Sequence, residues 1–165
     1  RIEDKIQLTV AVKEVALQDI IPGEIIEIDG TIYPLDFMNG ATLRFPGEIS
    51  SENLRINMSL PSFAKLDTNN GKVSYTNGIV QAVVFNVLID SVVVSPFIFK
   101  EPVIMTIPFN KADFSERGID PSDVRLFYAL DDGTLIAEGI HIIAVDSIHG
   151  LMTAELSHFS PLALA

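Results

Sequence analysis

The residues best suited to chemistry lie close to the C-terminal end of the sequence, in the tripeptide His158-Phe159-Ser160. A serine hydroxyl becomes a nucleophile when a neighbouring base takes its proton, and histidine is the commonest base. On an extended strand, residues two apart lie on the same face, so we expect His158 and Ser160 on one side. Ser160 Oγ would then attack the carbonyl carbon of Phe159 and form an ester, which water hydrolyses. The tripeptide is therefore a candidate for a single cut in its own backbone.

A flat strand is too extended for this attack, so self-cleavage requires a kinked or strained peptide between Phe159 and Ser160. Pro161 favours a bend, because proline lacks the N–H of the ladder and restricts the residue before it. The structural alternative is that His158 and Ser160 hydrogen-bond at the edge of a sheet while Phe159 fills an adjacent pocket. Strict alternation predicts that His158 and Ser160 share their face with Met152, Leu156, Leu162 and Leu164.

The sequence patterns that could bind a metal are less specific than the tripeptide. The segment Asp67-Thr68-Asn69-Asn70-Gly71 has the oxygen spacing that opens a calcium loop. However, the twelfth position, where a bidentate glutamate would stand, is Gly78. An Asx-rich turn is the preferred interpretation, with Asp67 and Asn69 as weak metal candidates. We expect no cofactor. The three histidines, which lack helical ligand spacing, are His141, His149 and His158.

Composition excludes several classes of protein. The chain has 165 residues, a formal net charge of −11 and no cysteine. Nucleic-acid binding requires clustered Lys and Arg, so we expect no nucleic-acid partner. The most apolar stretch, residues 79–99, is interrupted by polar residues and proline, so no membrane span is expected in this segment. Without cysteine there are no disulfides and no thiolate sites, a composition that fits an exported bacterial protein and a cytosolic one equally well.

The elements that position the tripeptide are predicted to be strands. Short apolar or alternating segments are separated by turn signals about every ten residues, which is typical of a sandwich or barrel. The only helical candidate is Lys111 to Gly118. We therefore predict an all-β, antiparallel β-sandwich with at most one short helix. Residues 1–39 are predicted to be N-terminal strands that form an added sheet edge or a small unit of the same domain, and residues 40–165 the sandwich itself. The principal predicted strands are 5–17, 24–28, 31–35, 41–45, 53–60, 79–94, 103–109, 124–130, 141–145 and 151–164.

Four segments of the sandwich carry a resemblance to a known family. From Gly40 onward the chain resembles the β-sandwich domain shared by zona-occludens proteins, ankyrins and netrin receptors, in its divergent bacterial form. The segments are Ala41-Thr42-Leu43-Arg44-Phe45-Pro46-Gly47-Glu48-Ile49-Ser50, Phe99-Lys100-Glu101-Pro102-Val103-Ile104-Met105-Thr106-Ile107-Pro108-Phe109, Val124-Arg125-Leu126-Phe127-Tyr128, and Gly150-Leu151-Met152-Thr153-Ala154-Glu155-Leu156-Ser157-His158-Phe159-Ser160.

This resemblance implies two alternatives. Some proteins with a His-Phe-Ser tripeptide at this place cut their own chain before the serine, and the related GAIN domain of adhesion receptors does so at a similar tripeptide. Many other proteins with this sandwich are adaptor or surface modules. We expect a non-catalytic interaction or structural module at a bacterial cell surface, part of a larger exported protein, with a protein or cell-envelope component as partner. The alternatives are single-turnover self-cleavage between Phe159 and Ser160, and a calcium- or glycan-binding surface module.

Overall fold

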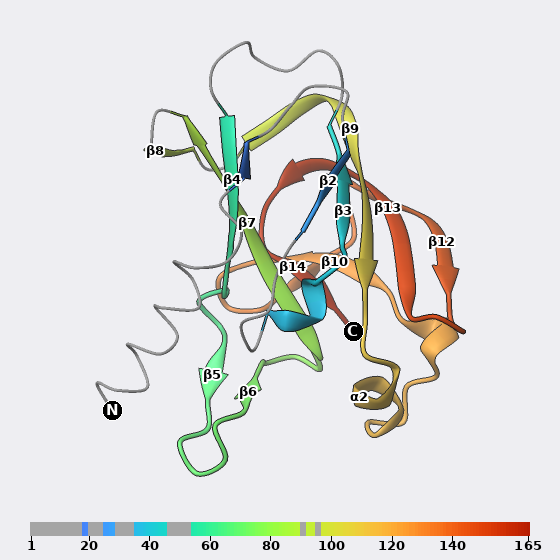
Figure 1. The fold of residues 1–165 in the computed structure, drawn as a ribbon. Helices are drawn as coiled ribbons and strands as arrows, with labels where there is room; N and C mark the ends of the chain where they lie inside the picture. Colours follow the sequence, from blue (N-terminus) through green and yellow to red (C-terminus); the bar gives the residue numbers. More distant parts are fainter. Residues whose placement is uncertain (1–17, 20–24, 29–34, 46–53, 90–91, 95–96) are drawn as a thin grey trace.

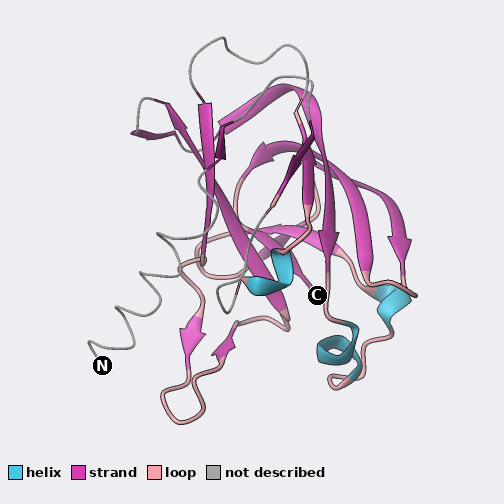
Figure 2. Cartoon of the chain, viewed as in Figure 1, coloured by secondary structure: helices cyan, strands magenta, loops and turns pink. Residues whose placement is uncertain are grey.

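The computed structural model describes residues 18–19, 25–28, 35–45, 54–89, 92–94 and 97–165. The strand expected over residues 5–17, and nearly all of the one expected over residues 31–35, lie outside this part of the chain. About half of the described residues form antiparallel strands in two larger sheets, with one short α-helix (Figures 1 and 2). The predicted all-β class is therefore confirmed.

The larger sheet has seven strands and the smaller one five. In spatial order the first contains β1 (Gln18–Asp19), β4 (Leu54–Ser59), β7 (Gln81–Ile89), β14 (Leu162–Leu164), β10 (Leu126–Ala129) and β11 (Leu135–Ile136), while β8 (Val92–Val94) pairs with β7. The second contains β12 (Ile140–Asp146), β13 (Leu151–Phe159), β9 (Phe97–Pro108), β3 (Thr42–Arg44) and β2 (Ile25–Glu27). Within residues 1–39, the described strands β1 and β2 each lie at the edge of one sheet, and β2 falls in the predicted strand 24–28 whereas β1 was not predicted.

The remaining elements are short. A separate hairpin pairs β5 (Lys65–Leu66) with β6 (Val73–Ser74). The α-helix α2 (Lys111–Ser115) begins where Asn110 Oδ1 accepts the backbone N–H of Ala112, an N-cap that satisfies one free donor of the first turn. Two 3₁₀ turns, η1 (Asp36–Met38) and η2 (Pro121–Asp123), complete the set.

One hydrophobic core joins the sheets. Alternate residues of β9 and β13 point inward, among them Met105, Ile107, Met152 and Leu156, all with 1% or less of their surface exposed. Each strand buries one face because side chains alternate along it. The N-terminal region joins the same cluster through Ile26, Ile28, Leu35 and Met38.

Two predicted strands are divided in the structure. Residues 79–94 form the hairpin of β7 and β8. Residues 151–164, predicted as a single strand, form β13 in the smaller sheet and β14 in the larger one.

The prediction that His158 lies on the same face of the strand as Met152 and Leu156 is wrong. The pairing of β13 with β9 shifts register between Leu156 and His158, and such a bulge reverses the alternation. Phe159 therefore points into the core with 3% of its surface exposed, whereas His158 is only half-buried and does not share the inward face of Met152 and Leu156.

Within the described ranges, no helix has both the length and the apolar character needed to cross a membrane.

Candidate functional site

The tripeptide His158-Phe159-Ser160 lies where the chain passes from one sheet to the other. Strand β13 ends at Phe159 and β14 begins at Leu162, so Ser160 and Pro161 form the connection. Strand β14 then lies between β7 and β10 and pairs with three residues of each. The bond between Phe159 and Ser160 is therefore at a crossover between sheets.

The proposed base and nucleophile are in contact. His158 Nδ1 and Ser160 Oγ are 2.9 Å apart, a hydrogen-bond distance, and both residues are half-buried. Whether the imidazole donates or accepts depends on which ring nitrogen carries the proton. With Nδ1 unprotonated, the hydroxyl donates to it, which is the arrangement that general-base activation of Ser160 requires. The structure thus brings the side chains of these two predicted residues together.

Tyr128, in β10, holds the backbone of His158. Its hydroxyl donates to His158 O at 2.7 Å and lies 3.3 Å from His158 N, whose N–H it accepts. The two rings are stacked, with centroids 4.1 Å apart and an interplanar angle of 19°. Burial raises the pKa of the Tyr128 hydroxyl, an effect that the hydrogen bond it accepts from the backbone of His158 partly opposes.

A second contact ties the same strand end to the turn before β12. The backbone N–H of Ser157 and its hydroxyl both donate to Gly139 O, at 3.1 and 3.0 Å. Gly139 has a φ of +86°, in the left-handed region that glycine adopts without steric cost. We call Tyr128, Gly139, Ser157, His158 and Ser160 the crossover cluster.

Phe159 anchors the crossover in the core. Its ring packs edge-on against Phe45, with centroids 6.0 Å apart, and in a tilted arrangement against Phe85 at 5.3 Å. Phe45 follows β3 of the smaller sheet and Phe85 lies in β7 of the larger one, so Phe159 contacts both layers. Aromatic pairs in these geometries add stability beyond the apolar area that they bury.

The arrangement supplies part of what an acyl shift requires. Ser160 has its base within hydrogen-bond distance, but cleavage also requires distortion of the peptide that is attacked. Phe159 still pairs with Phe97 as part of β13, in an extended strand. Among the described non-glycine residues, only Asn77 has a positive φ, so Phe159 and Ser160 are not in the left-handed region. The contact is ready for proton transfer, while the backbone on the Phe159 side remains that of an ordinary strand.

Tyr128 and Gly139 were missed at the sequence level because neither is close to the tripeptide in sequence. Tyr128 reaches His158 because β10 pairs with β14, and Gly139 directly precedes β12, which pairs with β13. A glycine at the start of a predicted strand was the only sequence signal for the second contact. Nothing in the sequence pattern singled out Tyr128 from the neighbouring apolar residues.

The weak metal candidates lie in the loop between β5 and β6, exposed to solvent. Asp67 Oδ1 accepts the backbone N–H of Asn69 at 2.9 Å, which is an Asx turn, as the sequence predicted. Of the other histidines, His141 lines a small pocket together with Gly139 and Ser157 and is 3.9 Å from Glu155, whereas His149 is 2.8 Å from Asp146. No group of three or more His, Asp or Glu side chains placed to hold a metal occurs in the described residues.

Comparison with known proteins yields no match, either to a protein-family model or to a curated protein sequence.

Proposed function

We propose that the chain is a non-catalytic structural or interaction module of an exported bacterial protein. The observation that carries this proposal is that each residue of the tripeptide helps to join the sheets. Phe159 packs between Phe45 and Phe85, Tyr128 binds the backbone of His158, and the side chains of His158 and Ser160 bind each other across the turn. The tripeptide thus has a structural role that requires no bond cleavage.

The setting of this module is proposed to be the bacterial cell surface, with a protein or cell-envelope component as partner. The resemblance to surface and adaptor sandwiches supports this assignment, and the absence of cysteine from the sequence is compatible with it. Limited proteolysis of intact cells of the source organism, followed by immunodetection of the domain, tests it. Loss of the signal without cell lysis is expected, and full protection of the domain would contradict the proposal.

A denaturing intact-mass measurement tests the non-catalytic proposal. We expect one species of 18.0 kDa, both as purified and after incubation with hydroxylamine, which attacks an ester formed at Ser160. A dominant product ending at Phe159 would refute it.

The structural role has its own test, the substitution Phe159→Ala. We expect it to lower the free energy of unfolding by about 3–5 kcal/mol, because it removes a buried aromatic ring and leaves a cavity. Phe127→Ala, in the neighbouring β10 and only half-buried, is the matched control and should cost less. Equal costs would show that Phe159 has no special part in joining the sheets.

A second candidate function is single-turnover self-cleavage between Phe159 and Ser160. The observation that favours it is the 2.9 Å contact between Ser160 Oγ and His158 Nδ1. The hydroxyl would add to the Phe159 carbonyl and pass its proton to the imidazole, which returns it to the departing amine of Ser160. The ester would then be hydrolysed by water. Residues 160–165 would remain bound, since β14 pairs on both sides with the larger sheet.

Variants distinguish the two functions. If the chain cuts itself, Ser160→Ala and His158→Ala abolish the fragments, whereas Ser115→Ala, at an exposed serine of α2 outside the crossover cluster, leaves them unchanged. Fragments that persist in Ser160→Ala would indicate an external protease instead. Native gels would not reveal the cut, because the released strand would remain paired in the sheet. The chain must therefore be denatured before its mass is measured.

A further inference from the structure

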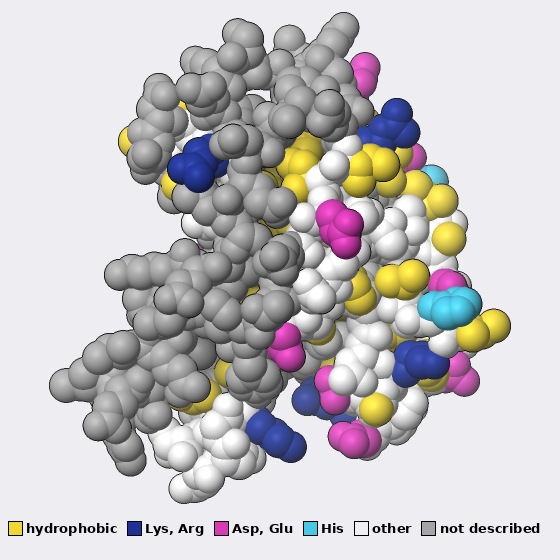
Figure 3. Space-filling view, in the orientation of Figure 1, with side chains coloured by type: hydrophobic (Ala, Val, Ile, Leu, Met, Phe, Trp, Pro, Cys, Tyr) yellow, Lys and Arg dark blue, Asp and Glu magenta, His cyan; other side chains and the backbone are white. Residues whose placement is uncertain are grey.

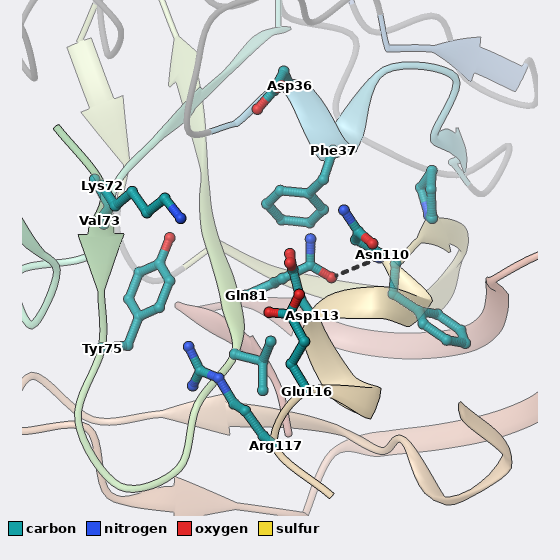
Figure 4. A pocket seen from close by; sticks show the side chains of 13 residues that line it. Asp36, Phe37, Lys72, Val73, Tyr75, Gln81, Asn110, Asp113, Glu116 and Arg117 are labelled. Carbon is teal, nitrogen blue, oxygen red and sulfur yellow. Dashed lines mark hydrogen bonds between the residues drawn. The ribbon is translucent and has the colours of Figure 1, made fainter. Parts of the chain in front are cut away.

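A pocket of about 640 Å³ lies on the side of the molecule where the β5–β6 hairpin, β7 and α2 meet. Its size falls in the range of small-molecule sites. It shares no residue with the crossover cluster, so it is independent of the function proposed above. The polar side chains that matter here are Asp36, Lys72, Gln81, Asp113, Glu116 and Arg117 (Figure 4).

Gln81 gives the first indication of a ligand. It is the only buried polar residue in the described part of the chain, with 5% of its surface exposed. Its side-chain oxygen accepts the backbone N–H of Asn110 at 3.1 Å. Its amide nitrogen has no hydrogen-bond partner among the described residues and is directed toward the ring of Phe37, which also lines the pocket (Figure 4). A buried donor without a partner is costly, so this position is suited to an acceptor supplied by a ligand.

The charges around Gln81 give the second indication. In Figure 4 the side chains of Lys72 and Arg117 extend along one side of the pocket, and those of Asp113 and Glu116 along the other. None of these four forms an ion pair within the described residues, where both ion pairs involve histidines elsewhere. Arg117 Nη1 donates to Ile79 O at 3.2 Å, which fixes the guanidinium beside the pocket.

We propose that this pocket binds a small zwitterion of the α-amino-acid type. Its carboxylate accepts from the free amide nitrogen of Gln81 and faces Arg117 and Lys72, and its ammonium group faces Asp113 and Glu116. Charge-assisted hydrogen bonds to both ends orient the ligand. A neutral sugar could accept from Gln81 but would leave the two opposed sets of charges unmatched.

A titration followed by ¹⁵N NMR tests this proposal with the twenty common amino acids as probes, each up to about 10 mM. We expect at least one to shift the amide signals of Gln81, Asp113 and Arg117 saturably, with a Kd of about 1 mM or lower. The methyl ester of that amino acid, which lacks the anion, and its N-acetyl derivative, which lacks the cation, should each bind about tenfold more weakly.

Matched variants identify the residues responsible. Lys72→Gln and Glu116→Gln should each weaken binding about tenfold. Lys65→Gln and Glu138→Gln make the same charge changes at exposed positions outside the pocket and should not affect binding. Gln81→Leu should abolish it. Should Gln81→Leu fail to fold, Lys72→Gln and Glu116→Gln, both at exposed positions, still decide the outcome.

Three results would overturn the proposal. The first is the absence of saturable shifts with any of the amino acids. The second is an equal loss of affinity in the control variants. The third is a hexose that produces the same shifts with an affinity unchanged by Lys72→Gln and Glu116→Gln, which would make the pocket a sugar site.

Discussion

The hydroxyl of Tyr128 is hydrogen-bonded to both backbone polar groups of His158, at 2.7 and 3.3 Å. Tyr128→Phe keeps the ring and its stacking but leaves these groups without that partner. We expect it to lower the free energy of unfolding by about 1–3 kcal/mol, the usual cost of an unsatisfied buried polar group. Urea denaturation measures this change. A loss within experimental error of zero would show that water replaces the hydroxyl without cost.

The raised pKa of the same hydroxyl predicts that the free energy of unfolding depends on pH in the alkaline range. Burial raises the pKa of Tyr128 in the folded state above its unfolded value, so its contribution to stability is full below about pH 10 and is lost as pH rises through the folded pKa. We expect the free energy of unfolding to decrease less steeply above about pH 10 in Tyr128→Phe than in the original chain. Identical slopes in the two proteins would contradict this prediction.

Gly139 is predicted to tolerate no side chain. A Cβ there would lie 2.7 Å from Ser157 Oγ, closer than real Cβ contacts, and 3.0 Å from the ring of Tyr128, tighter than most of them. Gly40 has nearly the same φ, +85° against +86°, but no atom within 4 Å of such a Cβ. Both alanine variants share the strain of a left-handed backbone, so we expect Gly139→Ala to cost about 1–3 kcal/mol more than Gly40→Ala through overpacking. Equal melting temperatures would exclude the clash.

Turns between strands depend on aspartates that bond to the backbone two residues on. Asp120 and Asp132 accept the backbone N–H groups of Ser122 and Thr134, each at 2.9 Å. Asp146, between β12 and β13, accepts those of residues 148 and 149, both at 3.1 Å. Hydrogen bonds donated to a charged carboxylate stabilise it and lower its pKa. The backbone N–H groups are the main cause of the lowered pKa of Asp120 and Asp146, whereas for Asp132 the side chain of Thr134 is the main cause and its backbone N–H the second.

These turns predict a loss of stability in acid. A carboxyl whose folded pKa is lowered stabilises the protein above its unfolded pKa of about 3.9, and this contribution is lost as pH falls through the folded value. The triple variant Asp120→Asn, Asp132→Asn, Asp146→Asn retains the acceptor oxygens but does not titrate. We expect its melting temperature to fall less steeply than that of the original chain below about pH 4. Parallel curves would show that other carboxylates dominate acid unfolding.

Strand prediction from sequence succeeded where one period holds throughout a segment. The alternation of residues 103–109 gives the inward face of β9, which the burial of Met105 and Ile107 confirms. It failed after Leu156, because a bulge inserts a residue and reverses the alternation, and no residue type at Ser157 or His158 signals this change. Pro161 did indicate a bend. It could not indicate that the bend separates two strands belonging to different sheets.

The order of the strands and the packing of distant segments form both the crossover cluster and the pocket beside Gln81. Neither can be predicted as a whole from the sequence alone. The contact between His158 and Ser160 was predictable because it is local. The contacts of Tyr128 and Gly139 are not local and follow from strand order. The pocket is assembled from separate segments, residues 36–37, 72–75, 80–81 and 108–117. The one sequence signal for the pocket was Gln81, which lies near the start of the apolar segment 79–94. A strand that is buried on both faces normally contains no polar residue at such a position.

At the scale of the whole molecule, net charge predicts the absence of nucleic-acid binding. The chain has 22 acidic and 11 basic residues, and Lys72 and Arg117 share their pocket with Asp36, Asp113 and Glu116. The face shown in Figure 3 likewise has its Lys and Arg interspersed with Asp and Glu. A protein gains affinity for nucleic acid by neutralising several adjacent phosphates, and nearby carboxylates repel them.

We therefore expect no saturable change in the fluorescence anisotropy of a labelled mixed oligonucleotide pool at about 0.15 M salt. Lowering the salt lengthens the range over which charges act, so binding that appears only at about 0.01 M and disappears on restoring salt would be non-specific attraction to scattered cations. Saturable binding at the higher salt, weakened by Lys72→Gln or Arg117→Gln, would instead show that the pocket receives a phosphate. In that case its carboxylates would have to be neutralised by a bound cation or by protonation, and the affinity would rise on acidification or on addition of magnesium.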